Sequence, residues 1–316
     1  MGLFSTLFGT AKPSENNKFE MLRDDGVRAM QMGEIKYAEK CFKAALDIQH
    51  DKQTVSYLAE TYLRMQDWEK ALPLLKEIAE TEEDSFELRI LLAQTQGELK
   101  LYEDELNTCK QVLEANPNEC RALCLTAEAE HGLGQNLQAI VHLTQSLSIR
   151  ENFQRALQLR AEILGEMGQW NEAMTDIEAL LKLNEEYEDF ILLHAKACAY
   201  LGRMEDATKD YLHVNELNPF NQDAILQLGS LYEQTGQRDK ALKLYDEAIE
   251  LQPEFAAAYK ARGGVKHALK DDAGATEDLK KALELDPQKA AELTGEFSTL
   301  ENKMNNAYRN MNPYGF

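Results

Sequence analysis

Residues 222–255 read QDAILQLGSLYEQTGQRDKALKLYDEAIELQPEF, and this stretch of 34 residues decides the fold. Its apolar residues recur at spacings of three and four, as they do on one face of an α-helix. Two breaks interrupt the pattern, at Gly236 and at Pro253. Gly can take the left-handed conformation that ends a helix, and Pro cannot continue one. The stretch therefore predicts two short amphipathic helices joined by a tight turn.

The same pattern recurs along most of the chain at a period of 34 residues. Gly236 has counterparts at Gly202, Gly168 and Gly134, and Pro253 has counterparts at Pro219 and Pro287. A helix pair of this length cannot bury its apolar face alone, so each unit needs its neighbours for stability. Eight repeats can be counted, and they start near Phe19, Lys52, Phe86, Cys120, Gln154, Glu188, Gln222 and Ala256.

This pattern resembles the tetratricopeptide repeat family. The family places Leu-Gly, Tyr, Ala, an aromatic residue, Ala and Pro at fixed offsets, which here are Leu228-Gly229, Tyr232, Ala241, Tyr245, Ala248 and Pro253. The resemblance covers about Phe19 to Lys289 and implies an all-α fold, a right-handed α-solenoid of about eight helix-turn-helix repeats. The third repeat departs most, because Glu105 stands where a small Ala is expected and Gln96 where Tyr is expected. These two departures do not favour tight packing of its two helices.

The chain is expected to divide into three parts. Residues 1–18 form an apolar N-terminal segment and linker, residues 19–289 form the repeat array, and residues 290–316 form a C-terminal capping helix with a short tail. The capping helix is predicted from one apolar stripe, in which Leu293, Phe297, Leu300, Met304 and Tyr308 recur at spacings of three and four. Such a helix would cover the exposed edge of the last repeat.

The amino-acid composition indicates which compartment and which classes of partner to expect. The chain has 316 residues, and 55 acidic against 34 basic residues give a formal charge of −21. So negative a balance disfavours nucleic-acid binding, which needs clustered Lys and Arg, and leaves protein or peptide partners. No stretch approaches the roughly 18 apolar residues that span a bilayer, so no integral membrane association is expected. Five cysteines, an odd and thinly spread set, suit reduced thiols in the cytoplasm.

The N-terminus allows two interpretations. Met1-Gly2 followed by Thr6 fits the myristoylation pattern. The alternative is that the apolar side chains of this segment pack on a neighbouring surface, which would permit self-association through the termini.

The sequence contains none of the common catalytic motifs considered next. The chain has no phosphate-binding Gly-rich loop with Lys-Ser or Lys-Thr, no Gly-x-Ser-x-Gly and no His-Glu-x-x-His. Cys124 and His131 lie about 10 Å apart along a helix, too far to share one metal ion, although Cys120 and Cys124 could be two ligands of a larger site. His194 is expected to be a hydrogen-bonded interior histidine. We therefore expect no enzyme, no cofactor and no metal.

Three aromatic residues stand at position 17 of their repeats. Trp68, Tyr102 and Trp170 each lie beside the turn between two helices. This regularity favours packing over ligand stacking.

If the first helices line the concave surface, as in the family, their positions 2, 5, 9 and 12 form the partner-binding stripe. The candidate residues there are Ile90, Arg121, Cys124, Glu128, Arg155, Gln158, Glu162, Leu192, Lys196 and Leu226. Arg121 and Arg155 are candidates for an acidic partner. The alternative is that Glu128 and Glu162, which stand next to them, neutralise them. The carboxylate clamp of some family members is disfavoured, because Lys260 is followed four residues on by Gly264.

The first hypothesis is a non-catalytic protein–protein interaction scaffold that binds a peptide or protein segment in the concave groove. The alternative is a regulatory or assembly factor that acts through the apolar N-terminus and the aromatic C-terminal tail, in self-association or localisation.

Two deletions separate these functions. Because the first hypothesis places binding on the repeats, chains that lack residues 1–12 or residues 312–316 are expected to retain the partner in a pull-down from native extract. Loss of self-association or of localisation with partner binding intact would favour the alternative.

Overall fold

In the computed structural model, which describes residues 15–81 and 85–287, every regular element is an α-helix. The helices of these residues are α1 (Glu15–Gln31), α2 (Ile35–Leu46), α3 (Lys52–Arg64), α4 (Trp68–Thr81), α5 (Phe86–Glu98), α6 (Tyr102–Ala115), α7 (Cys120–Gly132), α8 (Asn136–Ile149), α9 (Gln154–Glu166), α10 (Trp170–Leu183), α11 (Glu188–Tyr200), α12 (Met204–Leu217), α13 (Gln222–Gln234), α14 (Arg238–Leu251), α15 (Ala256–Ala268) and α16 (Asp272–Leu285).

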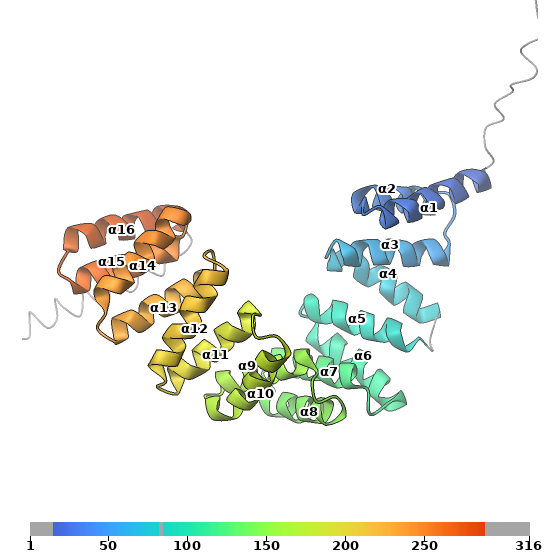
Figure 1. The fold of residues 1–316 in the computed structure, drawn as a ribbon. Coiled ribbons are helices and arrows are strands. Elements are labelled where there is room, and N and C mark those ends of the chain that lie inside the picture. Colours follow the sequence, from blue (N-terminus) through green and yellow to red (C-terminus); the bar gives the residue numbers. More distant parts are fainter. Residues whose placement is uncertain (1–14, 82–84, 288–316) are drawn as a thin grey trace, which may run out of the picture. The chain divides into compact units, whose positions relative to one another are not determined.

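The helices follow one another as regular pairs (Figure 1). From α3 onward the first helix of each pair has 13 residues and the second has 14. Each of the predicted starts from Lys52 to Ala256 is the first residue of a helix, and α1 begins before Phe19, at Glu15. The predicted all-α solenoid of about eight helix-turn-helix repeats is thus confirmed.

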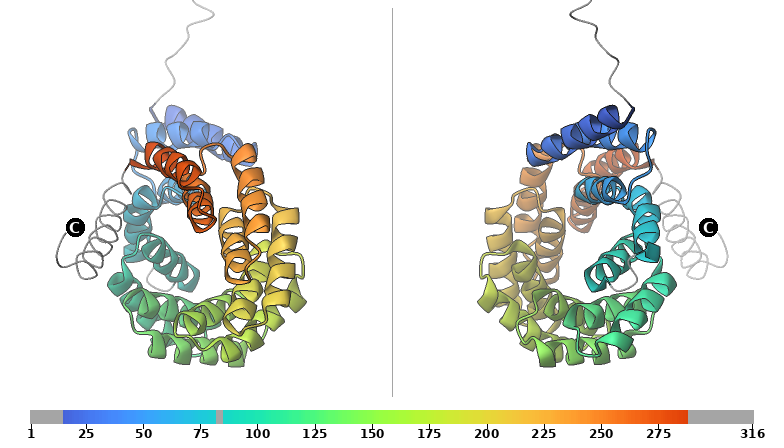
Figure 2. Two further views of the ribbon diagram at one scale, coloured as in Figure 1. Left: turned by 90° about the vertical axis from the view of Figure 1, so that its left-hand side faces the viewer. Right: turned by 90° about the vertical axis from the view of Figure 1, so that its right-hand side faces the viewer.

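The chain divides into two compact units, Met1–Ile163 and Leu164–Phe316, which we call unit 1 and unit 2. Within each unit the two helices of a pair pack on one another, as Figure 2 also shows. First helices also contact first helices, in α1 with α3, α5 with α7, and α13 with α15. The predicted N-terminal segment up to residue 14, the capping helix and the tail lie outside the described residues.

The turn between the two helices of each repeat is a Schellman motif. In the fourth repeat the amide of Gln135 donates to the carbonyl of Glu130 at 2.8 Å, and that of Gly134 donates to the carbonyl of His131 at 2.8 Å. The motif needs a left-handed residue, and Gly33, Gly134, Gly168, Gly202 and Gly236 supply it with φ between 75° and 78°. In the other three repeats Gln66, Lys100 and Lys270 take the same conformation, with φ of 57°, 58° and 67°.

The third repeat packs despite its two departures from the pattern. Glu105 is fully buried, and a side chain at Gly97 would meet its carboxyl group. The absence of a side chain at Gly97 therefore makes room for Glu105, which stands where the repeat pattern has a small Ala. Gln96 is buried as well, and it accepts a hydrogen bond from the Thr108 hydroxyl at 2.8 Å. The expectation against tight packing of α5 and α6 is therefore wrong, because a missing side chain on one helix compensates for the larger one on the other.

The left-handed lysine of the third repeat generates a stability prediction. An L-residue other than Gly pays about 1 kcal/mol in this conformation. The side chain of Lys100 is exposed, so Lys100→Gly is expected to raise the free energy of unfolding by roughly that amount, measured from urea unfolding curves.

The matched control is Gly236→Ala. A Cβ at Gly236 would meet nothing within 4 Å, so this change isolates the backbone penalty and should lower the free energy of unfolding by about 1 kcal/mol. An unchanged or lower urea midpoint for Lys100→Gly would contradict the explanation.

Candidate functional site

Unit 1 contains a hollow of about 470 Å³ that is lined mainly by first helices. Its lining is Leu91, Gln94, Thr95 and Glu98 of α5, Arg121, Cys124, Leu125 and Glu128 of α7, Arg155 of α9, Leu63, Trp68, and Arg150 with Phe153 from the loop before α9. The hollow thus combines an apolar surface with three guanidinium groups and two carboxylates. That mixture suits a segment carrying both charged and apolar side chains.

Arg121 is held by two carboxylates. Its guanidinium donates to both oxygens of Glu87, each at 2.7 Å, and to Glu119 at 2.8 Å. The hydrogen bond from Arg121 lowers the pKa of Glu87, and this carboxylate also keeps 73% of its side chain exposed. Arg121 and Glu87 stand at the same position of neighbouring repeats, so this pair bridges the repeats.

A second bridge of the same kind joins the next repeats. Arg155 donates to Glu128 at 2.6 Å, while Glu162 accepts a hydrogen bond from Gln158 at 3.0 Å. Of the neutralising pairs that the sequence suggested, the structure contains the one between Arg155 and Glu128, whereas Arg121 pairs with Glu87 and Glu119 instead. Exposed pairs of this kind contribute at most about 1 kcal/mol, so a ligand carboxylate can compete for the guanidinium.

Arg150 differs from the other two arginines of the hollow. Its guanidinium carbon lies 5.1 Å from the centre of the Phe153 ring, and the side chain forms no ion pair with any residue in the described part of the chain. A cation over an aromatic ring keeps its outward edge available for a carboxylate. Arg150 was not predictable from the repeat pattern, because it lies in the loop between two repeats and not on the first-helix stripe.

A buried carboxyl group lies within electrostatic range of the hollow. Burial raises the pKa of Glu105 to about 8; the charges of Glu128 and Glu98 act in the same direction, and Arg155 opposes them. Neither carboxyl oxygen has a hydrogen-bond partner within the described residues. A carboxylate without donors is costly in an apolar environment, so the neutral acid is the favoured form below about pH 8.

The predicted partner-binding residues separate into two groups. Arg121, Glu128, Arg155, Gln158, Glu162, Lys196 and Leu226 are exposed or half-buried. Ile90, Cys124 and Leu192 are buried, so their expected exposure on the stripe is wrong. Ile90 shows the reason: its side chain packs in a core with Val112 of its own repeat and with Ala122 and Leu125 of the next.

Unit 2 holds the remaining predicted residues. Lys196 of α11 donates to Asp223 of α13 at 3.2 Å, another bridge between neighbouring repeats. Leu226 lies half-buried one turn beyond Asp223 on the same helix. These residues do not line the hollow of unit 1.

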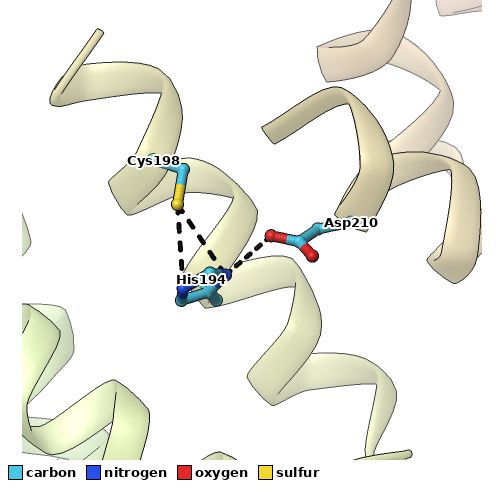
Figure 3. Close-up of side chains that lie close together, drawn as sticks. All are labelled: His194, Cys198 and Asp210. Carbon is cyan, nitrogen blue, oxygen red and sulfur yellow. Dashed lines mark hydrogen bonds and ion pairs between the residues drawn. The ribbon is translucent and has the colours of Figure 1, made fainter. Parts of the chain in front are cut away.

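His194 is hydrogen-bonded as predicted, but its side chain is half-buried and 17% exposed, not fully interior. Its Nδ1 lies 2.6 Å from Asp210, and the Cys198 Sγ lies 3.8 Å from Nδ1 and 3.7 Å from Nε2 (Figure 3). The spacing of four between His194 and Cys198 places these two on one face of α11, but Asp210 joins them from α12 and was not predictable from that spacing. His131 instead lies 2.9 Å from Asn136 through Nδ1, on another repeat.

The aromatic residues at position 17 pack on small residues and other rings. A side chain at Gly132 would meet the ring of Tyr102, and one at Gly165 would meet Trp170. Trp170 also stacks on Tyr200, with ring centres 4.8 Å apart. Trp68 differs, because it lines the hollow of unit 1.

None of the helices in residues 15–81 and 85–287 is long and apolar enough to cross a membrane.

Two family models match parts of the chain. The model for the anaphase-promoting complex, cyclosome, subunit 3 matches residues 31–112, and a tetratricopeptide repeat model matches residues 222–265. No curated protein matches the sequence.

Solved structures share the fold. A tetratricopeptide repeat protein from Parabacteroides merdae is 19% identical, with a TM-score of 0.51 over 85% of this chain and 93% of that one. PilW, described as a widely conserved type IV pilus biogenesis factor, is 18% identical, with a TM-score of 0.56 over 65% of this chain and 96% of its own. At these identities the likeness concerns the fold alone.

The raised pKa of Glu105 generates a prediction about pH. The unfolded chain loses this proton near the ordinary value of 4.5 and the folded chain only near 8, so stability falls as the pH rises between these values. Glu105→Gln removes the ionisation. We expect the urea midpoint of the variant, relative to that of the unsubstituted protein, to rise between pH 5 and pH 8.5.

Glu103→Gln is the matched control, because Glu103 lies on the same helix with an exposed side chain. Its urea midpoint should follow that of the unsubstituted protein across the same pH range. Parallel profiles for Glu105→Gln and the unsubstituted protein would show that Glu105 does not titrate as the structure indicates.

Proposed function

We propose that this chain, which belongs to the tetratricopeptide-repeat family, is a non-catalytic scaffold that binds a peptide or protein segment at the hollow of unit 1. Repeats of this family serve generally as protein–protein interaction scaffolds. The observation that carries the finer proposal is the lining of the hollow, where guanidinium groups stand beside an apolar surface.

The charged part of the lining favours a carboxylate ligand. Arg121 already holds Glu87 in a two-bond arrangement, and a guanidinium recognises a carboxylate best in that geometry. Because Glu87 is mostly exposed, a carboxylate of the partner can replace it at small cost. Arg150 adds a positive charge that no carboxylate of the described residues neutralises.

The apolar part of the lining favours a neighbouring apolar side chain. Leu63, Leu91 and Leu125 contribute to the same hollow as the arginines. Burying an apolar side chain there supplies most of the affinity, and the carboxylate supplies orientation. The segment we propose therefore carries an acidic residue close to a large apolar one.

The alternative function, through residues 1–12 and 312–316, places binding on segments outside the described residues. No contact in the described part of the chain favours it. The hollow is therefore the site on which we base the proposal.

The experiment starts from the partner segment. Cross-linking and affinity purification from native extract define the segment, and a synthetic peptide of it is titrated against purified variants by calorimetry. Arg150→Glu breaks no ion pair of the described residues, and Arg121→Glu reverses the charge that holds Glu87. Each is expected to weaken binding at least about tenfold, which corresponds to 1.4 kcal/mol.

The control is Arg203→Glu, which breaks a surface pair with Asp206 in unit 2. Its affinity for the peptide should stay within about twofold of the unsubstituted value. Equal affinities of all three variants would place the peptide away from the hollow, and the proposal would then be wrong.

A further inference from the structure

A nitrogen, a sulfur and an oxygen donor meet in the sixth repeat, on residues that are not among those lining the hollow. His194 and Cys198 lie one turn apart on α11, and Asp210 faces them from α12 (Figure 3). One ligand atom from each residue lies within 4.8 Å of the others. Three different metal-binding groups therefore point toward one another from two packed helices.

The spacing of the donors fits one metal ion. Zn²⁺ binds His nitrogen at about 2.0–2.1 Å and Cys sulfur at about 2.3 Å, so a tetrahedral ion separates the two atoms by about 3.6 Å. The Cys198 Sγ lies 3.8 Å from Nδ1 of His194, the ring nitrogen that also faces Asp210. Coordination thus needs little movement of either side chain.

Nδ1 of His194 is the ring nitrogen that faces both other donors. It lies 2.6 Å from the Asp210 carboxylate and 3.8 Å from the Cys198 Sγ. An ion bound between the three groups replaces the hydrogen bond between Nδ1 and Asp210, because the nitrogen must offer its lone pair to the metal. His194, Cys198 and Asp210 then each supply one ligand atom.

The group of three donors is largely buried but remains partly accessible to solvent. Cys198 is buried, whereas the His194 and Asp210 side chains remain 17% and 20% exposed. Asp206 stands one turn before Asp210 on α12 and acts electrostatically on the thiol, although Arg203 currently holds it at 2.8 Å. The fourth position of an ion is therefore open to water or to a further carboxylate.

Other histidines of the chain show what an ordinary contact looks like. His142 lies 2.7 Å from Glu130, and His267 lies 2.7 Å from Asp272. Both are simple histidine–carboxylate pairs, and neither belongs to a group of three donors within the described residues. The thiol is what separates the sixth repeat from them.

We propose that His194, Cys198 and Asp210 bind one divalent transition-metal ion of borderline softness, of which Zn²⁺ is the representative. A mixed nitrogen, sulfur and oxygen set selects such an ion over Mg²⁺ or Ca²⁺, which take oxygen ligands. Binding replaces the proton of the Cys198 thiol, and this proton passes to the solvent. The ion would join α11 to α12 within one repeat.

The experiment uses Co²⁺ as a visible substitute for Zn²⁺, on the full-length protein without a histidine tag. A thiolate bound to Co²⁺ gives a charge-transfer band in the near ultraviolet, so titration reports the cysteine directly. We expect this band to saturate at one equivalent and to disappear when Zn²⁺ is added. Cys198→Ser should abolish the band, and Asp210→Asn, which removes a ligand, should weaken binding at least about tenfold.

The controls account for the other thiols and histidines. Cys120→Ser removes a half-buried thiol of the fourth repeat, and His142→Gln removes a histidine of a simple pair. Both variants should keep the band and its stoichiometry. If the band survived in Cys198→Ser and vanished in Cys120→Ser, the metal would be bound by Cys120 and not by Cys198. That result would overturn the proposal.

Folding is monitored in parallel, because Cys198 lies in the core. Far-ultraviolet circular dichroism confirms that each variant remains helical. Asp210→Asn tests the site even if Cys198→Ser unfolds, because the Asp210 side chain is partly exposed. Absence of the band in the unsubstituted protein, or equal Zn²⁺-induced shifts of Tm in the unsubstituted protein and Asp210→Asn, would show that this group does not bind metal.

Discussion

The contact of a small residue on one helix with a bulky side chain on its partner is the constraint on which the repeats depend. Gly26 lies under the ring of Phe42 and Gly229 under that of Tyr245, at equivalent positions of the first and seventh repeats. The bulky rings are almost fully buried, so a side chain at either glycine would displace them. Close approach of the two helices then determines which other residues face the next repeat and which face solvent.

The third repeat meets the same constraint at another pair of positions. Gly97 on α5 leaves room for Glu105 on α6, so the volume is filled, but by an acid instead of a hydrocarbon. This arrangement conserves packing and introduces a titratable group among the apolar contacts. This repeat also contributes four residues to the hollow, so the least regular part of unit 1 supports its candidate binding surface.

The fold was predictable because its determinants are local and periodic. Helix starts, turn glycines and the small residues at the crossings all recur with the 34-residue period, and each has a direct steric reason. The burial of Ile90 and Leu192 was not predictable from one helix; Ile90 is buried in part by Ala122 and Leu125 of the next repeat. Nor was the grouping of His194 with Asp210, because it depends on how the faces of α11 and α12 oppose each other.

The ion pairs and the shifted pKa values were the features least predictable from the sequence. Arg121 and Arg155 were predicted as candidate partner-binding residues, yet only the structure shows which carboxylate each one binds. The raised pKa of Glu105 depends on burial, which its residue type would not suggest. Arg150 acquires its distinct role from a loop geometry that has no counterpart in the repeat pattern.

The left-handed residues Gln66, Lys100 and Lys270 have a consequence for the cooperativity of unfolding. In a repeat array the free energy is close to a sum of repeat and interface terms, so a penalty in one turn stays in that repeat. The turns of the second, third and eighth repeats therefore carry a penalty of about 1 kcal/mol that the glycine turns do not, which favours local opening of these repeats. Their backbone amides would exchange with solvent deuterium ahead of the repeats whose turns carry glycine, and the array would not melt as a single block.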